Sequence, residues 1–289
     1  MKKYVLIFWV LALLAPINTW SQDTIKVLAI GNSFSVDAVE NYLHELGQAE
    51  GVTFIIGNLY IGGCSLERHW LNAQGNKADY SYRKINRAGE KTTIMNVSLI
   101  QGITDEEWDY ISFQQNSPNS GLLDTYFPYL IQLTAYTKEH CKNSQVKFVF
   151  HQTWAYANDS DHKEFPRYNK NQKQMYESIM KASSRAAIKA GIETIIPSGT
   201  AIQNGRSSFI GDRFCRDGYH LNLDIGRYTA ACTWFESLTG KSVVGNSFVP
   251  HAVTPLEAVT VQRAAHEAVL KPFKVTTIRL VDNKTYSDN

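Results

Sequence analysis

A serine, an aspartate and a histidine near opposite ends of the chain could together form a hydrolytic site. Ser33 follows the apolar segment 26–30, and Asp217 and His220 lie three residues apart in a later loop. A serine hydroxyl becomes a nucleophile when an imidazole accepts its proton and a carboxylate orients that imidazole. The three residues therefore predict acyl-transfer chemistry, provided that the fold brings them together.

Each of these motifs also fits a purely structural role. Asn32 and the two serines beside it could simply start a helix, because Asn and Ser are preferred helix N-caps. We expect Ser35 to be the N-cap, which leaves Ser33 free for another role. Asp217 and His220 alone are a weak signal, since Asp-x-x-His occurs by chance in many surface loops.

Strand and helix patterns alternate along the chain and indicate how the motifs are positioned. Strands alternating with helices predict an α/β fold, a three-layer α/β/α sandwich around a parallel sheet. The polar segment 77–102 departs from this rhythm and is expected to be an inserted hairpin. The predicted strands are 26–30, 52–59, 109–113, 146–150 and 193–196, and the predicted helices are 36–50, 122–141, 169–190, 221–238 and 255–270.

Ser33 stands where a parallel sheet binds its ligands. It follows the first predicted strand and precedes the first predicted helix. Ligands of open α/β sheets bind at the carboxyl ends of the strands. The free N–H groups at the helix start would favour developing negative charge there.

In this order, the motifs resemble those of the SGNH, or GDSL-like, hydrolase superfamily. The first block of that family is Gly-Asp-Ser, and here Asn32 replaces the aspartate before Ser33. Gly63 stands after the second strand in the place of the glycine block, and Asp217 with His220 matches the last block. The resemblance implies flavodoxin-like layering, a catalytic triad of these three side chains, and an oxyanion hole containing the backbone N–H groups of Ser33 and Gly63. It implies no metal and no cofactor.

The third block of the family departs from its usual pattern in this chain. The family has Gly-x-Asn-Asp, whose asparagine amide joins the oxyanion hole, whereas this chain has Gln114-Gln115-Asn116-Ser117 after its third strand. A glutamine amide can donate the same hydrogen bond over a longer reach. We expect Gln115 to be the donor, with Gln114 and Asn116 as alternatives, and the departure indicates a divergent branch.

Aromatic residues near the same sheet edge suggest a sugar ester as substrate. Trp70, His151 and Trp154 could line a cleft, because aromatic rings present apolar faces to sugars. The alternative is that they pack the loops. We therefore expect a serine esterase, a carbohydrate O-acetylesterase in particular. A non-catalytic glycan-binding protein and a lipase or thioesterase remain alternatives.

The start of the chain predicts export. Lys2 and Lys3 precede the apolar run 5–15, which has the length of a signal-peptide core and is short for a membrane span. We expect a signal peptide over 1–21, a hydrolase domain over 22–274 and a tail over 275–289, the tail being a short strand or a frayed end. We therefore expect a periplasmic or secreted protein without stable membrane insertion. The alternative is that the segment is not cleaved and anchors the protein in the membrane.

The charge of the chain bears on its binding partners, and its cysteines bear on possible disulfides. Without Lys2 and Lys3, basic and acidic residues are equal in number, which gives no reason to expect a nucleic-acid partner. A small-molecule or glycan ester remains the expected partner, and the oligomeric state is open. The four cysteines, Cys64, Cys141, Cys215 and Cys232, could be buried thiols, and a bridge between Cys64 and Cys215 is conceivable.

Overall fold

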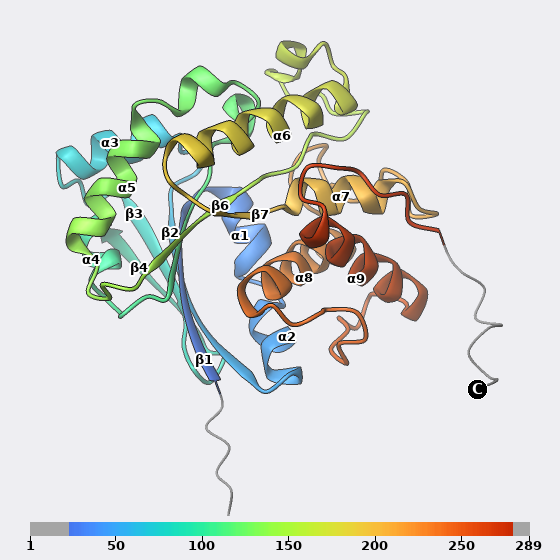
Figure 1. Cartoon of the computed structure of the whole chain (residues 1–289), viewed down its shortest axis with the longest axis horizontal. Coiled ribbons are helices and arrows are strands. Elements are labelled where there is room, and N and C mark those ends of the chain that lie inside the picture. Colours follow the sequence, from blue (N-terminus) through green and yellow to red (C-terminus); the bar gives the residue numbers. More distant parts are fainter. Residues whose placement is uncertain (1–22, 280–289) are drawn as a thin grey trace, which may run out of the picture.

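Five parallel strands form the centre of the protein in a computed structural model that describes residues 23–279 (Figure 1). The sheet has the order β4-β3-β2-β1-β5-β6-β7, in which β3 and β4 form an antiparallel hairpin beside β2. The parallel strands alone follow the flavodoxin order 2-1-3-4-5, so the predicted fold class and the inserted hairpin are confirmed. The strands are β1 (Asp23–Gly31), β2 (Val52–Tyr60), β3 (Tyr80–Ile85), β4 (Lys91–Val97), β5 (Tyr110–Phe113), β6 (Lys147–His151) and β7 (Thr194–Ile196).

The central strand β1 is buried on both faces, which is why its sequence is continuously apolar. Its side chains alternate: Val27 and Ala29 enter one core, and Leu28 and Ile30 enter the other. A strand covered on both faces needs helices on each side, and the chain supplies them between the parallel strands and after the last of them, β7.

Helices cover both faces of the sheet (Figure 1). One core lies between the sheet and α1, α2, α7 and α8, with α9 packed on α7 and α8. The other lies under α3, α4 and α5, and α6 contributes side chains to both. The helices are α1 (Ser33–Val39), α2 (Leu43–Ala49), α3 (Leu66–Gln74), α4 (Leu99–Ile103), α5 (Tyr129–His140), α6 (Gln172–Lys189), α7 (Ser198–Arg206), α8 (Ile225–Thr239) and α9 (Pro255–Leu270), with 3-10 turns η1 (Ser117–Asn119), η2 (Leu123–Tyr126) and η3 (Phe165–Tyr168).

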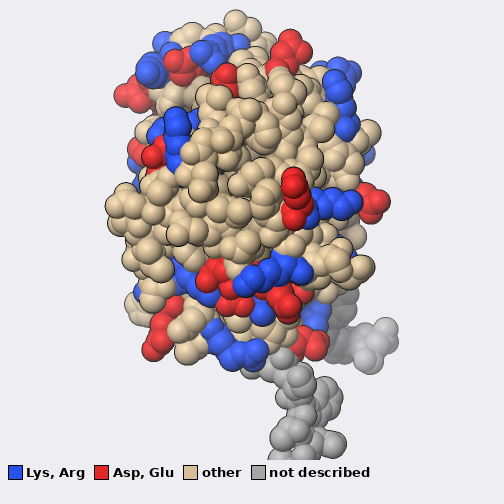
Figure 2. Space-filling model, turned by 90° about the vertical axis from the view of Figure 1, so that its left-hand side faces the viewer, with Lys and Arg blue, Asp and Glu red and all other residues tan. Residues whose placement is uncertain are grey.

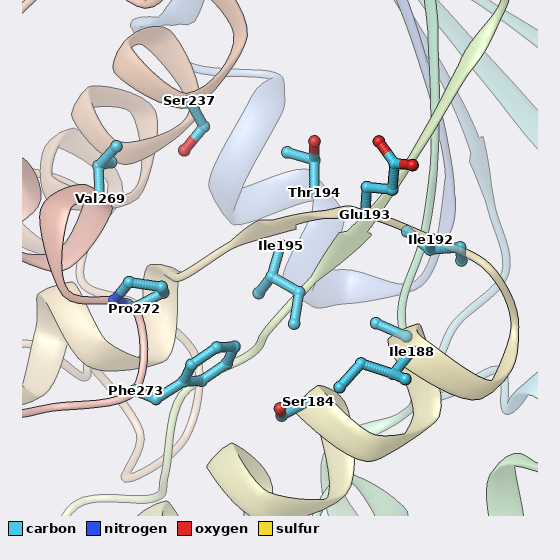
Figure 3. A pocket seen from close by; sticks show the side chains of 11 residues that line it. Ser184, Ile188, Ile192, Glu193, Thr194, Ile195, Ser237, Val269, Pro272 and Phe273 are labelled. Carbon is cyan, nitrogen blue, oxygen red and sulfur yellow. The ribbon is translucent and has the colours of Figure 1, made fainter.

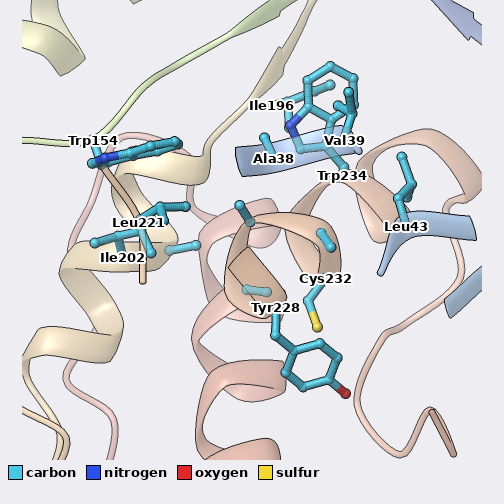
Figure 4. Close-up of a cluster of buried hydrophobic side chains, with 14 of the residues drawn as sticks. Ala38, Val39, Leu43, Trp154, Ile196, Ile202, Leu221, Tyr228, Cys232 and Trp234 are labelled. Carbon is cyan, nitrogen blue, oxygen red and sulfur yellow. The ribbon is translucent and has the colours of Figure 1, made fainter. Parts of the chain in front are cut away.

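The first core holds α1 against α8, the two helices that flank the predicted catalytic residues. Figure 4 shows Trp234 of α8 next to Ala38 and Val39 of α1, all of them fully buried. A fully buried side chain of Trp size contributes roughly 2 kcal/mol or more relative to its exposed state. This packing fixes α1 relative to the segment that precedes α8.

Two details of the first helical segment differ from the prediction. The expected helix 36–50 is divided into α1 and α2, because Tyr42 takes a left-handed conformation with φ 68°. The N-cap of α1 is Asn32, whose side chain accepts a hydrogen bond from Phe34 N, and Ser35 lies inside the helix. Ser33 is therefore the first residue of the helix.

Other boundaries shift for local reasons. The helix expected over 122–141 begins at Tyr129, directly after Pro128, and η2 precedes it. The described part of the tail, 275–279, is no strand: its backbone N–H groups at Thr276 and Ile278 donate to side chains of α7 and of the residue after it. The predicted signal peptide, 1–21, lies outside the described residues.

Neither a membrane span nor a disulfide is found in the described part of the chain. No helix between residues 23 and 279 is both long and apolar enough to cross a membrane. The four cysteines are free thiols, so the conceivable Cys64–Cys215 bridge is absent. Burial raises the pKa of Cys64 to about 12 and that of Cys215 to about 11, which makes both thiols unreactive near neutral pH.

Charged side chains of opposite sign stand next to each other on the face shown in Figure 2, which is the left-hand side of Figure 1. They surround a broad uncharged area in the middle of that face. Neither sign dominates this side of the molecule.

Candidate active site

The start of α1 and the loop before α8 bring Ser33, His220 and Asp217 into one hydrogen-bonded row. Ser33 Oγ lies 2.8 Å from His220 Nε2, and His220 Nδ1 lies 2.6 Å from Asp217 Oδ2. With the Nδ1 proton donated to the carboxylate, Nε2 is free to accept the serine proton. The row has the geometry of a nucleophile, a general base and an orienting carboxylate.

The loop that carries Asp217 and His220 is shaped by its own sequence. Asp217 Oδ1 accepts hydrogen bonds from the backbone N–H groups of Tyr219, at 3.2 Å, and His220, at 2.7 Å. Gly218 has φ +83°, and a Cβ there would stand 2.8 Å from Ser160 Oγ. Residue 218 must therefore be glycine, because of its positive φ and because a side chain would collide with Ser160. The spacing of three residues between Asp217 and His220 lets one carboxylate bind both the backbone of the turn and the imidazole.

The surroundings keep Asp217 ionised and His220 oriented. Burial opposes ionisation of Asp217, but hydrogen bonds from the His220 side chain and from the His220 and Tyr219 N–H groups outweigh it and lower its pKa. The His220 ring packs against Tyr219, with ring centroids 4.2 Å apart, and the edge of Phe34 approaches it at 6.0 Å. Only 18% of the His220 side chain is exposed, which restricts its rotation.

The row opens into a cleft of about 320 Å³ at the carboxyl edge of the sheet. This is the point where the strand order reverses, between β1 and β5, which is where flavodoxin-like sheets bind ligands. The cleft is lined by residues at the ends of β1, β2 and β5 and by residues of two loops: Asn32, Ser33, Phe34, Tyr60, Gly62, Gly63, Asn116, Ser117, Pro118, His162, Tyr219 and His220.

Three groups in this lining can donate hydrogen bonds to an oxyanion. The backbone N–H of Ser33 is the first of α1, and the first N–H groups of a helix have no intrahelical partner. Gly63 lines the cleft and has φ +63°, a left-handed conformation that favours glycine. Asn116 completes the set: its Nδ2 donates one hydrogen bond to Gly63 O at 3.1 Å and has a second N–H.

Gln115, the donor expected from the sequence, is not in the cleft. Its side chain is buried, and its Nε2 donates to the carbonyl and hydroxyl of Thr125 at 3.0 and 3.2 Å. Its Oε1 accepts from Leu66 N at 3.1 Å. The amide is fully used in joining the third block to α3 and η2, and the neighbouring Asn116 takes the position in the cleft.

Gln114 lies beneath the cleft and orients the residue before the nucleophile. Its Nε2 donates to Asn32 Oδ1 at 2.8 Å, and its Oε1 pairs with His151 Nδ1 at 2.9 Å. Asn32 Nδ2 in turn donates to Cys64 O at 3.0 Å. The three amide side chains after β5 thus have different partners, and of the three only that of Asn116 lines the cleft.

The residues expected to bind sugar are packing residues instead. His151 is fully buried between Gln114 and Ser198 Oγ, which is 3.0 Å from its Nε2. Trp154 is fully buried and stacks on Phe34, with ring centroids 4.2 Å apart. Trp70 packs against α5 and does not line the cleft. None of the three lines the cleft.

Other aromatic residues do line the cleft, Tyr60, His162 and Tyr219 among them. Tyr60 ends β2 under the guanidinium of Arg83, which lies 4.1 Å from its ring centroid. Tyr219 lies inside the Asp-x-x-His motif, and His162 faces it with ring centroids 4.8 Å apart. The position of Tyr60 at a strand end and that of Tyr219 beside His220 could have signalled them, whereas His162 lies in a loop without any pattern.

The described residues contain no metal-binding cluster, and the cavity at β7 has no histidine. Among residues 23–279, no group of three or more His, Cys, Asp or Glu side chains could hold a metal ion. Figure 3 shows a cavity of similar size, about 340 Å³, at the edge strand β7, lined by Ile188, Ile195 and Phe273 among others. It contains no histidine and therefore has no base of the His220 kind.

Comparison with known proteins identifies the family of this chain and a solved relative that covers most of it. The family model described as Domain of unknown function (DUF4886) matches residues 26–268. The crystal structure of a DUF4886 family protein from Bacteroides uniformis is 55% identical, covers 89% of this chain and 98% of its own, and superposes with a TM-score of 0.87. No curated protein matches the chain at a significant level.

More distant solved structures include two hydrolases. An acetyl xylan esterase from Geobacillus stearothermophilus is 13% identical, with coverage of 78% of this chain and 97% of its own and a TM-score of 0.46. A GDSL-like lipase from Bacteroides thetaiotaomicron is 11% identical, with coverage of 74% and 86% and a TM-score of 0.41.

Proposed function

We propose that this chain, which belongs to the family described as Domain of unknown function (DUF4886), is a serine hydrolase that cleaves carboxylic esters. The observation that carries the proposal is the continuous row Ser33–His220–Asp217, with distances of 2.8 and 2.6 Å, at the wall of a cleft. We further infer that the chain is a divergent member of the SGNH, or GDSL-like, superfamily in which Asn116 supplies the third-block amide.

The row supports the following acylation step. Ser33 Oγ attacks the ester carbonyl carbon while its proton passes to His220 Nε2, and the carbonyl π electrons move to the oxygen. The N–H groups of Ser33, Gly63 and Asn116 Nδ2 receive that oxyanion. When the tetrahedral intermediate collapses, the ester C–O bond breaks and His220 gives its proton to the leaving alcohol. Asp217, whose pKa is lowered, remains ionised and stabilises the imidazolium.

Deacylation repeats these roles with water in place of Ser33. His220 takes a proton from water, the resulting hydroxide attacks the acyl-serine, and the Ser33 oxygen leaves with the proton that His220 returns. The products are a carboxylic acid and the free enzyme. The proton transfers use only Ser33, His220 and water, and the oxyanion is received by groups that line the cleft.

The cleft favours a short acyl group on a polar alcohol. Its volume of about 320 Å³ is at the small end of the range for ligand sites. Tyr60, His162 and Tyr219 line it with aromatic surfaces that carry polar atoms, the combination that suits a sugar ring. We therefore propose an exported carbohydrate O-acetylesterase. The Ser33–His220 hydrogen bond favours it over a binding-only protein, and the small cleft favours it over a lipase or thioesterase.

Kinetics with esters of graded chain length test the proposal. p-Nitrophenyl acetate, butyrate and octanoate are compared with an acetylated xylo-oligosaccharide, with Ser33→Ala as the control for the nucleophile. We expect the highest kcat/KM for acetyl esters and a loss of at least about 1,000-fold in kcat for Ser33→Ala. Equal turnover by wild type and Ser33→Ala would overturn the assignment, and a rate that rises with chain length would overturn the acetyl preference.

A further inference from the structure

A buried carboxylate lies one helical turn after the proposed nucleophile and has no place in the reaction steps above. Asp37 and Ser33 are both on α1, four residues apart, and Asp37 is fully buried. A buried charge is strongly unfavourable unless it is paired and hydrogen-bonded. The partners of Asp37 should therefore reveal what it holds.

All the partners of Asp37 belong to the histidine-bearing loop or to the helix that follows it. Arg216 Nη1 lies 3.1 and 3.2 Å from its two carboxylate oxygens. Arg227, in the first turn of α8, donates from Nε at 2.9 Å and contacts it through Nη2 at 2.8 Å. The backbone N–H of Leu221 donates at 2.9 Å.

Two of these contacts bracket the pair Asp217 and His220. Arg216 directly precedes Asp217, and Leu221 directly follows His220. The ends of this loop are also joined to each other, because Arg216 N donates to His220 O at 2.9 Å and the Arg216 guanidinium to Leu221 O. One carboxylate thus attaches both ends of the loop to the helix that begins with Ser33.

We propose that Asp37 is a positioning residue that fixes the distance between Ser33 and His220, an inference that rests on the proposed function. Positions 33 and 37 are one turn apart on the same helix, so their relative position is fixed. A loop that is anchored at Asp37 therefore holds the His220 imidazole at a fixed distance from Ser33 Oγ. The charge of Asp37 is needed as well as its shape, since it compensates two guanidinium groups. A displacement of about 1 Å at the reacting atoms costs on the order of 100-fold in rate.

Asp37→Asn separates this role from general stability when it is compared with Glu40→Gln. Glu40 is the matched control: it caps the same helix, its side chain is 1% exposed like that of Asp37, and it also pairs with two cations, Arg83 and Lys91. It has no contact with the histidine loop. With p-nitrophenyl acetate we expect Asp37→Asn to lower kcat on the order of 100-fold with KM within about twofold, and Glu40→Gln to leave kcat within about twofold at a comparable loss of stability.

The effect of Asp37→Asn should depend on whether His220 is present, and a general loss of stability would not show this dependence. In a His220→Ala background, Asp37→Asn should change the residual rate by less than about twofold, because the residue through which Asp37 acts is gone. An equal kcat for Asp37→Asn and Glu40→Gln, or a full 100-fold loss in the His220→Ala background, would overturn the proposal. If Ser33→Ala retains activity, the proposed function itself fails, and that result is distinct from either outcome.

A milder variant serves if Asp37→Asn does not fold. Arg216→Ala removes the guanidinium contacts to Asp37 and to Leu221 O while leaving Asp37 paired with Arg227 and Leu221 N. Arg216 is about one third exposed, so its loss leaves little buried charge without a partner. We expect kcat to fall by about 10-fold with KM nearly unchanged, and an unchanged kcat in the folded variant contradicts the proposal.

Discussion

Asn32 donates a hydrogen bond from its side-chain amide to the carbonyl oxygen of Cys64, 3.0 Å away. The bond joins the turn before the proposed nucleophile to the loop that contains Gly63. The other end of the amide, Oδ1, accepts from Phe34 N and from Gln114 Nε2. Asn32 therefore connects the ends of β1, β2 and β5 beneath the cleft, and it does so with both a donor and an acceptor.

Asn32→Asp should weaken this junction. The aspartate keeps the acceptor for Phe34 N and Gln114 Nε2, but it places a second carboxylate oxygen against Cys64 O, where the amide now donates. Losing a buried hydrogen bond and leaving its acceptor without a donor costs about 1–3 kcal/mol. We expect urea unfolding to show a loss of this size, together with a lower kcat on p-nitrophenyl acetate. A variant as stable as wild type would show that the amide donor is not needed.

Asn116, and not Gln115, should determine turnover. Asn116→Ala removes a side-chain donor from the cleft, and the loss of one oxyanion donor typically lowers kcat by about 100-fold or more. Gln115→Ala removes the side-chain partner of Leu66 N and of Thr125 O, so we expect its main effect on stability. Measured kcat values and unfolding curves for the two variants test this. A larger kcat loss for Gln115→Ala in a fully folded protein would restore the glutamine as donor.

Trp154→Phe should affect stability and leave substrate affinity unchanged. The phenyl ring can keep the stacking on Phe34 but loses the hydrogen bond from Trp154 Nε1 to Tyr219 O, 2.7 Å long. A lost hydrogen bond of this kind costs about 1 kcal/mol. We expect thermal unfolding to begin at lower temperature while KM for an acetylated oligosaccharide stays within error. A several-fold rise in KM would mean that Trp154 reaches the substrate after all.

The positions of Ser33 and His220 could be predicted because general rules of topology determine them. Ligand sites of parallel sheets lie at the carboxyl ends of the strands, and Ser33 follows the first of them directly. The spacing of Asp217 and His220 also has a local cause, since one carboxylate binds the turn and the ring at once. Such local relationships can be read from a sequence.

The residues around them could not be predicted because tertiary contacts determine them. Gln114, Gln115 and Asn116 are consecutive polar residues. Which of their amides enters the cleft depends on hydrogen-bond partners such as Asn32 and Thr125, whose positions follow no sequence pattern. The burial of Trp154 depends likewise on Phe34. The break between α1 and α2 occurs at Tyr42, whose positive φ leaves no mark in the apolar periodicity.

Two fully buried histidines should make the protein sensitive to mild acid. Burial is the main cause that lowers the pKa of His69 and of His151 to about 3 in the folded protein, from 6.5 when exposed. Between these values the unfolded chain binds a proton at each histidine and the folded chain does not. Stability is therefore full above about pH 6.5 and is lost as the pH falls toward 3, at up to about 1.4 kcal/mol per pH unit for each histidine.

The contribution of His151 can be measured by replacing it with a side chain that does not titrate. His151→Gln offers an amide to the same partners, Gln114 Oε1 and Ser198 Oγ, but binds no proton in the unfolded state. Urea unfolding at pH 7, 6 and 5 should give a free energy of unfolding that falls less steeply for this variant, by up to about 1.4 kcal/mol per pH unit. His251→Gln is the control, because His251 is a histidine on the exposed surface. If wild type, His151→Gln and His251→Gln lose the same free energy of unfolding per pH unit, protonation of His151 in the unfolded chain is not the cause of the acid sensitivity.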